Sequence, residues 1–330
     1  MKICIVKLSA MGDIIHAMVA LEFIKKYLPD SKIDWVVEAG FKGILENNPH
    51  IDNILPVNIK SIKTKKSNFF SQYSLLKKYS KNNYDLLIDA QGLLKSAIVS
   101  RIIGAKTIAG FDKDSIRESI SALFYQHKVN IPYIANAIDR NMSVICEPLA
   151  INYTKDQILN KKQFLYFSKK IDQNKEFYIT LIVGASKENK IYPKEKFVEL
   201  LNKLKEKTLI VWGNENEFNT ASFIAQNSKY ATVAPKGNLD DLKAIIAGSK
   251  MVIGGDTGPT HMGWALNIPS ITIFGNTPEY RNTYITTFNK VIKSNSKVNP
   301  LKLDYTDFSI NEIEVKKIMD LYYTIIPLTK

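Results

Sequence analysis

Two hydrophobic patterns alternate along the first half of the chain. Short, almost wholly apolar runs predict strands buried on both faces. Longer segments with apolar side chains every three or four positions predict amphipathic helices. The predicted strands are 2–7, 33–38, 53–57, 84–90 and 106–109, and the predicted helices are 14–27, 41–47, 69–82 and 93–103. Strands that alternate with helices are typical of parallel βαβ units.

The same alternation begins again after a polar segment rich in Lys, Asn and Gln. The second set of predicted strands is 177–183, 208–212, 251–255 and 270–274, and the helices are 194–206, 215–227, 239–248 and one that begins near 257. The pattern therefore predicts an α/β protein with two βα domains. We place the first domain at 1–155, a linker at 156–176, the second domain at 177–309 and a last helical segment at 310–330.

Length and composition agree with two globular domains. The chain has 330 residues, of which 45% are hydrophobic and 23% charged, and single cores rarely grow beyond about 250–300 residues. No apolar run is long enough to predict a transmembrane helix, and the apolar part of the start is too short for a signal peptide. We therefore expect a cytoplasmic protein. Two cysteines and four histidines predict neither a disulfide framework nor a metal site.

The formal net charge is +13. Such a charge attracts polyanions, whether nucleic acid, an anionic membrane leaflet or phosphorylated substrates. A lysine-rich proteome would explain it equally well. Because the sequence shows no nucleic-acid-binding motif or aromatic stacking platform, we expect no nucleic-acid partner.

The loop after the first strand, 7–13, is the first candidate site. Ligands of open α/β sheets bind beyond the carboxyl ends of the strands. The loop contains Gly12 alone, so it is not a dinucleotide-binding fingerprint. Asp13 falls near the start of the next helix, where it could do chemistry or only cap the helix.

The segment GGDTGPTHMG at 254–263 is the second candidate site. It joins a strand to a helix through glycines, and the backbone N–H groups at a helix start bind phosphate. The alternative is that Asp256 only caps the helix and His261 only packs in the core.

Three further polar residues follow strands of the second half. Lys190, with Ser186 nearby, could meet a diphosphate as a point charge. Glu217 could accept hydrogen bonds from ribose hydroxyls. A solvated lysine and an acidic first helical turn are the alternatives. Basic residues of the first half fit an anionic acceptor or leaflet, or a solvated loop: Lys60, Lys63, Lys65, Lys66, Arg117 and Arg140.

Several of these segments identify a family. The opening IVKLSAMGDIIHAMVAL, DWVVEAGF at 34–41, DAQGLLKSA at 89–97, GFDKDSIRES at 110–119 and DTGPTHMGWAL at 256–266 resemble the bacterial heptosyltransferases. DWVVE and SIRE favour the enzymes that add the first heptose, whereas the proline of DTGP is closer to those that add the second. The resemblance implies an inverting glycosyltransferase with the GT-B fold. In this fold two Rossmann-like domains face a central cleft, and the last helix packs back on the first domain.

The resemblance also implies roles for individual residues. Asp13 matches the catalytic base, and Lys190 a lysine at the donor phosphates that serves catalysis too. The implied donor-binding residues are Ser186, Lys190, Glu217, Asp256, Thr257, Gly258 and His261. The implied acceptor-binding residues are Lys7, Lys60, Lys63, Arg117 and Arg140.

The implied reaction moves L-glycero-D-manno-heptose from ADP-heptose to Kdo of Kdo-lipid A, in the synthesis of the lipopolysaccharide or lipooligosaccharide inner core. It needs neither metal nor cofactor, and it takes place at the anionic cytoplasmic face of the inner membrane. Addition of the second heptose and another GT-B glycosyltransferase activity stay open as alternatives, and so does a nucleotide-sugar epimerase.

Overall fold

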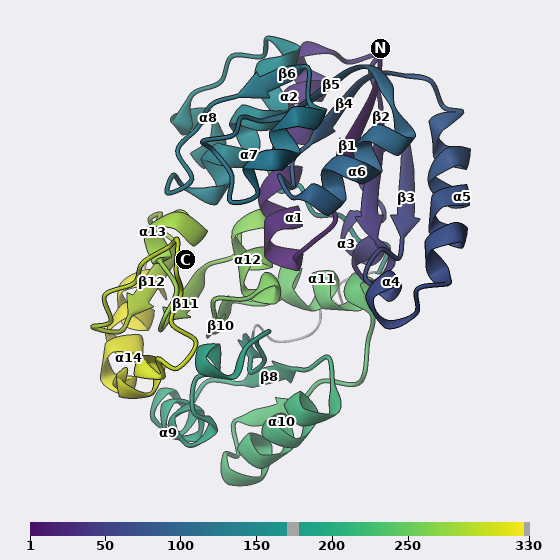
Figure 1. The fold of residues 1–330 in the computed structure, drawn as a ribbon. Coiled ribbons are helices and arrows are strands. Elements are labelled where there is room, and N and C mark those ends of the chain that lie inside the picture. Colours follow the sequence, from purple (N-terminus) through teal and green to yellow (C-terminus); the bar gives the residue numbers. More distant parts are fainter. Residues whose placement is uncertain (170–177, 327–330) are drawn as a thin grey trace. The chain divides into compact units, whose positions relative to one another are not determined.

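A computed structural model describes residues 1–169 and 178–326, apart from the side chain of Lys63. The chain forms two compact units, Met1–Tyr166 and Phe167–Lys330, and in each of them helices pack on a parallel sheet (Figure 1). The division falls inside the predicted linker. Its first part belongs to the first unit, where Ile158 and Leu165 are buried. Positions 170–176 of the predicted linker lie outside the described residues.

The first unit is built on one six-stranded parallel sheet. Its strands are β1 (Lys2–Val6), β2 (Lys32–Glu38), β3 (Asn53–Val57), β4 (Tyr84–Asp89), β5 (Ala105–Phe111) and β6 (His127–Val129). Its helices are α1 (Met11–Met18), α2 (Ala20–Tyr27), α3 (Lys42–Leu45), α4 (Ser61–Thr64), α5 (Asn68–Ser80), α6 (Leu94–Ile103), α7 (Ala137–Cys146) and α8 (Lys155–Leu159). The strand order is β3-β2-β1-β4-β5-β6, which is that of a Rossmann fold.

The second unit repeats this topology. Its strands are β7 (Ile179–Ile182), β8 (Thr208–Val211), β9 (Ala231–Val233), β10 (Met251–Gly255), β11 (Ser270–Phe274) and β12 (Asn289–Lys293). Its helices are α9 (Lys194–Leu204), α10 (Glu215–Asn227), α11 (Leu239–Ala247), α12 (Gly258–Ala265), α13 (Glu279–Asn282) and α14 (Val315–Ile325). The order β12-β11-β10-β7-β8-β9 places its first strand, β7, beside its fourth, β10, as β1 lies beside β4 in the first unit.

The longest predicted elements are found within a few residues of their predicted ends, but short edge elements were missed. The predicted helix 14–27 is interrupted and forms α1 and α2. Strands β6, β9 and β12 were not predicted, and each lies at the edge of its sheet. Helix α7 was also missed, although its hydrophobic face is buried in the first unit.

The last helix corrects an expectation. Resemblance placed 310–330 on the first domain, whereas α14 packs on α9 and on strands β11 and β12 of the second unit. Ile318 and Ile325 are completely buried in that unit's core, and the Tyr322 hydroxyl donates to Glu206 Oε1 at 2.8 Å. Burial of these apolar side chains in the core of the second unit stabilises α14 at this position.

Helix length also bears on membrane association. Among residues 1–169 and 178–326, no helix combines the length and the apolar composition that crossing a bilayer requires.

The place of α14 predicts the effect of a core mutation. Ile318→Ala should lower the free energy of unfolding by about 2–5 kcal/mol, because it leaves a cavity in a closed core. Hydrogen exchange should accelerate in β10 and β11 and stay unchanged in β1 and β4. Lys316→Ala, at an exposed position of the same helix, is the control. Faster exchange in the first sheet instead would contradict the assignment of α14 to the second unit.

Candidate active site

In each sheet the strand order reverses at one point, and proteins with this topology bind their ligands there. In the first unit that point lies between β1 and β4. The loop that leaves β1 is held there by Gln91, just past β4, whose Oε1 accepts the backbone N–H groups of Leu8 and Ser9 at 3.0 Å each. In the second unit the corresponding point lies between β7 and β10.

Asp13 lies in the first turn of α1, at the end of the anchored loop. The backbone N–H of Ala10 donates to its Oδ2 at 3.1 Å, so the carboxylate caps the helix start as the sequence allowed. The side chain is half-buried. The cap fixes the direction of the carboxylate and uses one of its two oxygens, so capping and chemistry are compatible.

Asp256 is the most strongly connected residue at the second switch point. It follows β10 directly, and its side chain is 6% exposed. Lys190 Nζ lies 2.7 Å from Oδ2, and His261 Nε2 lies 3.1 Å from Oδ1. The Thr277 hydroxyl and the Asn282 amide donate to Oδ2 at 2.8 Å and 3.0 Å. Four partners from three segments therefore converge on one carboxylate.

This convergence keeps Asp256 ionised. Burial alone would raise its pKa, but the Lys190 ammonium and the hydrogen bond from His261 hold the pKa of the carboxyl well below its usual range. The half-buried ammonium of Lys190 is thus fixed beside the turn. The alternative reading of Lys190 as a solvated surface lysine does not describe this geometry. His261 is buried and bonded to the same carboxylate, so it is more than a packed core histidine.

Helix α12 starts directly after the turn at Asp256 and Thr257. Thr257 is the N-cap, yet its side chain makes no cap hydrogen bond, and α12 begins at Gly258. The first N–H groups of a helix have no partner within it, and they carry partial positive charge. A Cβ at Gly255 would lie 2.8 Å from the carbonyl oxygen of Lys190, so glycine lets these two segments pack closely. Lys190 and the helix start together form a site suited to an anion.

Glu217 lies at the neighbouring strand end. Its Oε2 accepts the Gly213 N–H at 2.7 Å, and its Oε1 accepts the Asn214 amide at 2.9 Å. A Cβ at Gly184 would meet the Glu217 carboxylate at 2.1 Å, so the carboxylate lies against the backbone just past β7. Ser186 is exposed in the loop between β7 and Lys190. The predicted donor residues are therefore grouped at the carboxyl ends of β7, β8 and β10.

The predicted acceptor residues are less uniform. Lys7 is buried, and its ammonium donates to the Ala90 carbonyl at 2.7 Å and to Asn141 Oδ1 at 3.0 Å. Arg140 is buried too, and its guanidinium donates to backbone carbonyls of Ser115, Ile131 and Pro132. Both side chains hold the first unit together, a role the sequence did not suggest.

The other acceptor candidates lie at the surface. Lys60 is exposed over the Phe41 ring, 5.0 Å from its centroid. Arg117 is exposed and stacks on Tyr133, with the Arg140 guanidinium 5.2 Å from the same ring. Lys63 belongs to α4, and its side chain lies outside the described residues.

Thr277 and Asn282 were not predicted. They follow β11, the neighbour of β10, so their loop ends at the same sheet edge as the DTG turn. The polar run Asn276-Thr277, one residue after the apolar strand 270–274, was the signal that could have found them. As for a metal, no group of three or more His, Cys, Asp or Glu side chains that could hold one is present in the described part of the chain.

Comparison with known proteins agrees with this arrangement. The model of glycosyltransferase family 9 (heptosyltransferase) matches residues 72–306. Lipopolysaccharide heptosyltransferase 1 of Campylobacter coli is 40% identical to this chain, and the match covers 97% of this chain and 98% of that protein. The chain belongs to glycosyltransferase family 9.

Two further relatives of this heptosyltransferase come from Escherichia coli. Lipopolysaccharide heptosyltransferase 1 of strain K12 is 30% identical over 84% of this chain and 88% of that protein. Structures of heptosyltransferase WaaC with ADP and with ADP-2-deoxy-2-fluoro heptose each superpose with a TM-score of 0.83 and 25% identity, over 98% of this chain and 99% of the other. The predictions of family and of a GT-B fold with two Rossmann-like domains are confirmed.

The Lys190–Asp256 ion pair of the heptosyltransferase should make the free energy of unfolding depend on pH. Asp256→Asn should lower the free energy of unfolding by about 2–5 kcal/mol at neutral pH, because it leaves the Lys190 charge without its partner. The pKa of Asp256 is lowered in the folded state, so its stabilising effect is present above about pH 4, the ordinary range of Asp, and declines as the pH falls further.

Urea unfolding followed by circular dichroism over this pH range checks the prediction. The gap between the native protein and Asp256→Asn should narrow below about pH 4. Asp320→Asn, at an exposed position of α14 in the same unit, is the control. A gap that stays the same from neutral to acid pH would show that the charge of Asp256 does not stabilise the fold.

Proposed function

We propose that this enzyme transfers L-glycero-D-manno-heptose from ADP-heptose to Kdo of Kdo-lipid A. The names of its relatives and the ligands of the two WaaC structures support the substrate class. The observation that carries the proposal is the Lys190–Asp256 ion pair at a topological switch point, beside the start of α12, where the N-cap Thr257 makes no side-chain cap hydrogen bond. The relatives named heptosyltransferase 1 favour addition of the first heptose over addition of the second.

The donor's diphosphate is assigned to the second unit. The Lys190 ammonium offers a point charge that Asp256 holds in position. The backbone N–H groups of Gly258 and Thr260 at the start of α12 offer neutral donors, whereas Pro259 between them has none. Glu217 would accept hydrogen bonds from the ribose, and Ser186 would donate to a phosphate oxygen. Asp256 and His261 stay assigned to the donor side of the site, as the family resemblance implies.

The proposed chemistry is a single displacement with inversion. Asp13 removes the proton of a Kdo hydroxyl, whose oxygen then forms a bond to the anomeric carbon of the heptose. The bond from that carbon to the diphosphate oxygen breaks, and ADP leaves with the electron pair. Lys190 and the N–H groups of α12 stabilise the negative charge where it develops, the part that a divalent metal would otherwise take.

Acceptor recognition is proposed for basic residues of the first unit. Lys60 and Arg117 are exposed and can bind phosphate or carboxylate groups on the acceptor, and Arg117 is already oriented by its stacking on Tyr133. Lys63 stays a predicted acceptor contact. Lys7 and Arg140 stay as predicted contacts, but their internal hydrogen bonds support a positioning role for them. A lipid-linked acceptor places the reaction at the cytoplasmic face of the inner membrane.

The reaction itself is the first test. Incubation with ADP-heptose and Kdo-lipid A should yield one product heavier by a single heptose, measured by mass spectrometry. The same yield is expected with EDTA, because charge stabilisation comes from Lys190 and backbone donors. Activity lost in EDTA and regained with Mg²⁺ would contradict the metal-free step. Release of free ADP and sugar without acceptor would favour another activity.

The role of Asp13 has a second test. Asp13→Asn should lower kcat by about 10²–10⁴-fold, the usual worth of a general base, with ADP affinity unchanged. Lys190→Ala should instead weaken ADP binding as well as lowering kcat. Asp30→Asn, an exposed aspartate in the first unit, is the matched control. A near-normal kcat for Asp13→Asn would remove this residue from the mechanism.

A further inference from the structure

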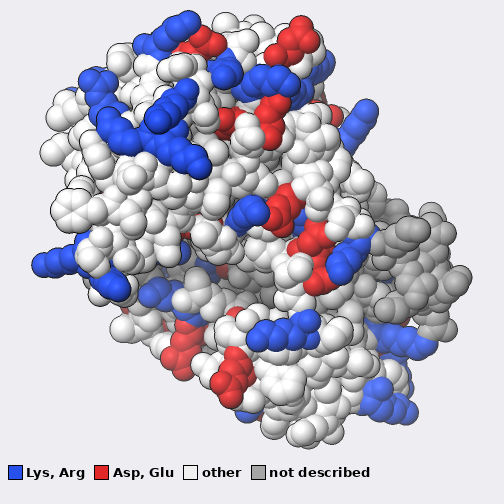
Figure 2. Space-filling view, turned by 90° about the vertical axis from the view of Figure 1, so that its right-hand side faces the viewer, with Lys and Arg blue, Asp and Glu red and all other residues white. Residues whose placement is uncertain are grey.

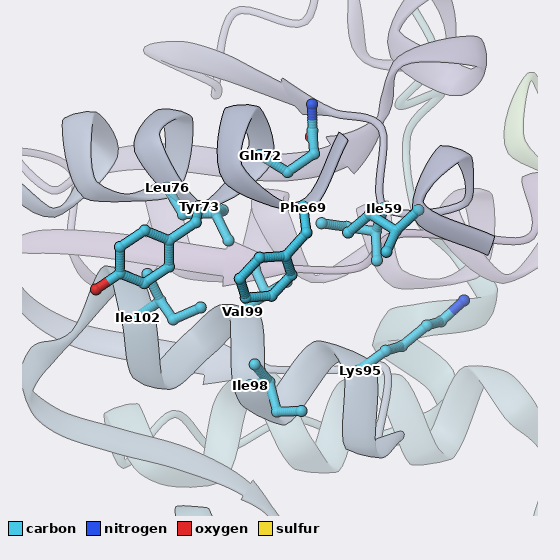
Figure 3. Close-up of a pocket in the computed structure, with 10 residues that line it drawn as sticks. Ile59, Phe69, Gln72, Tyr73, Leu76, Lys95, Ile98, Val99 and Ile102 are labelled. Carbon is cyan, nitrogen blue, oxygen red and sulfur yellow. The ribbon is translucent and has the colours of Figure 1, made fainter. Parts of the chain in front are cut away.

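Helices α5 and α6 enclose an apolar pocket on the surface of the first unit. Its volume is about 160 Å³ and it is open to solvent. Aliphatic and aromatic side chains dominate its lining, which comprises Ile59, Ile62, Phe69, Gln72, Tyr73, Leu76, Lys95, Ile98, Val99 and Ile102. In Figure 3 the rings of Phe69 and Tyr73 descend from α5 toward Ile98 and Ile102 of α6, while the Lys95 ammonium points away from them.

An aromatic cluster covers the outer side of this pocket. Phe69, Phe70 and Tyr73 are 49%, 76% and 42% exposed. The Phe69 ring stacks on Tyr73 at 6.2 Å and meets Phe70 edge-on at 5.7 Å between centroids. Ile98 on α6 is 42% exposed as well. A cluster of large, solvent-exposed apolar side chains marks an interaction surface more often than isolated exposed apolar residues do.

The surroundings of the cluster are strongly basic. From Asn53 to Tyr84 the sequence contains seven lysines and no acidic residue. From Ala90 to Phe111 it contains Lys95, Arg101 and Lys106, of which Lys106 is paired with Asp85 at 2.7 Å. Figure 2 faces the side of α5 and shows an uncharged area bordered by Lys and Arg. Two carboxylates accept backbone N–H groups at the starts of α4 and α6: Glu38 accepts the Lys60 N–H, and Glu118 accepts the Leu94 N–H.

We propose that this α5–α6 patch, centred on Phe69, Phe70, Tyr73 and Ile98, is the surface with which the protein sits on an anionic lipid bilayer. Aromatic side chains enter the boundary between headgroups and acyl chains, and the open pocket accepts part of an acyl chain. The lysines around them meet the negative headgroups and add electrostatic attraction to the apolar contact. Apolar area and positive charge on one face are the combination that interfacial binding requires.

Charge and shape favour a bilayer over other polyanions. Single-stranded nucleic acid also binds lysine-rich surfaces with aromatic rings, but it stacks its bases on open ring faces. Here Phe69 and Tyr73 stack on each other, and the pocket beneath them is aliphatic. A second copy of this basic patch would repel the first.

The inference deepens the proposed function and rests on it in one respect, namely that the acceptor is carried in a membrane. Binding to the bilayer would hold the first unit beside its acceptor. The test therefore measures membrane binding without donor or acceptor, so that it can fail independently of the proposed reaction.

The experiment is co-sedimentation of the full chain with vesicles of phosphatidylcholine, alone or mixed with phosphatidylglycerol. The native protein should bind the mixed vesicles, and added salt should weaken this binding. Phe70→Ser and the double variant Lys77→Glu, Lys78→Glu should each need about tenfold more lipid for half-binding. Unchanged circular dichroism and melting temperature show that the variants are folded.

Matched controls lie in the second unit. Phe288→Ser replaces a phenylalanine that is 42% exposed, and Lys316→Glu, Lys317→Glu reverses two adjacent exposed lysines of α14. Both controls should bind as the native protein does. All variants should keep their rate of heptose transfer to acceptor dispersed in detergent, because the patch lies outside the proposed chemistry.

Three results would overturn the inference. The native protein could fail to bind the mixed vesicles, or the controls could lose as much binding as the patch variants. Alternatively, Phe70→Ser could leave vesicle binding intact and abolish self-association in sedimentation equilibrium or retention of a single-stranded oligonucleotide. Absence of heptose transfer by the native protein would contradict the proposed function, while the vesicle result would still decide about the patch.

Discussion

The burial of one charge organises the second unit. A carboxylate with little access to water is stable only with partners, because burial alone favours its neutral form. Asp256 obtains them from the loop after β7, from α12 and from the segment after β11. The same contacts fix Lys190 beside the helix start, so the need to stabilise Asp256 builds a positively charged site in advance of any ligand.

The first unit positions its carboxylate by simpler means. Asp13 is held by the Ala10 N–H of its own helix turn and by the loop that Gln91 anchors. It has no cationic partner comparable to Lys190 among the contacts that the described residues make. A carboxylate oriented by backbone donors keeps an oxygen for an incoming hydroxyl, whereas the Asp256 carboxylate is used by its four partners. Two aspartates, each after a central strand of its unit, therefore suit different tasks.

The sequence predicted what depends on local pattern. Apolar runs located the central strands because both of their faces are buried, and the edge strand β9 was missed because its side chains are partly exposed. Asp13, Lys190 and Asp256 could be found because they follow such strands. The internal roles of Lys7 and Arg140 could not, since their partners at Asn141 and Ser115 come from distant segments. Thr277 and Asn282 were missed because their partner, Asp256, follows a different strand, β10.

The most direct test is a crystal structure of the enzyme with ADP. The account predicts that the diphosphate lies within hydrogen-bond distance of the Lys190 ammonium and of the first backbone N–H groups of α12, with the Lys190–Asp256 pair intact. A diphosphate bound elsewhere, or a Lys190 side chain turned away from both Asp256 and the phosphates, would contradict it.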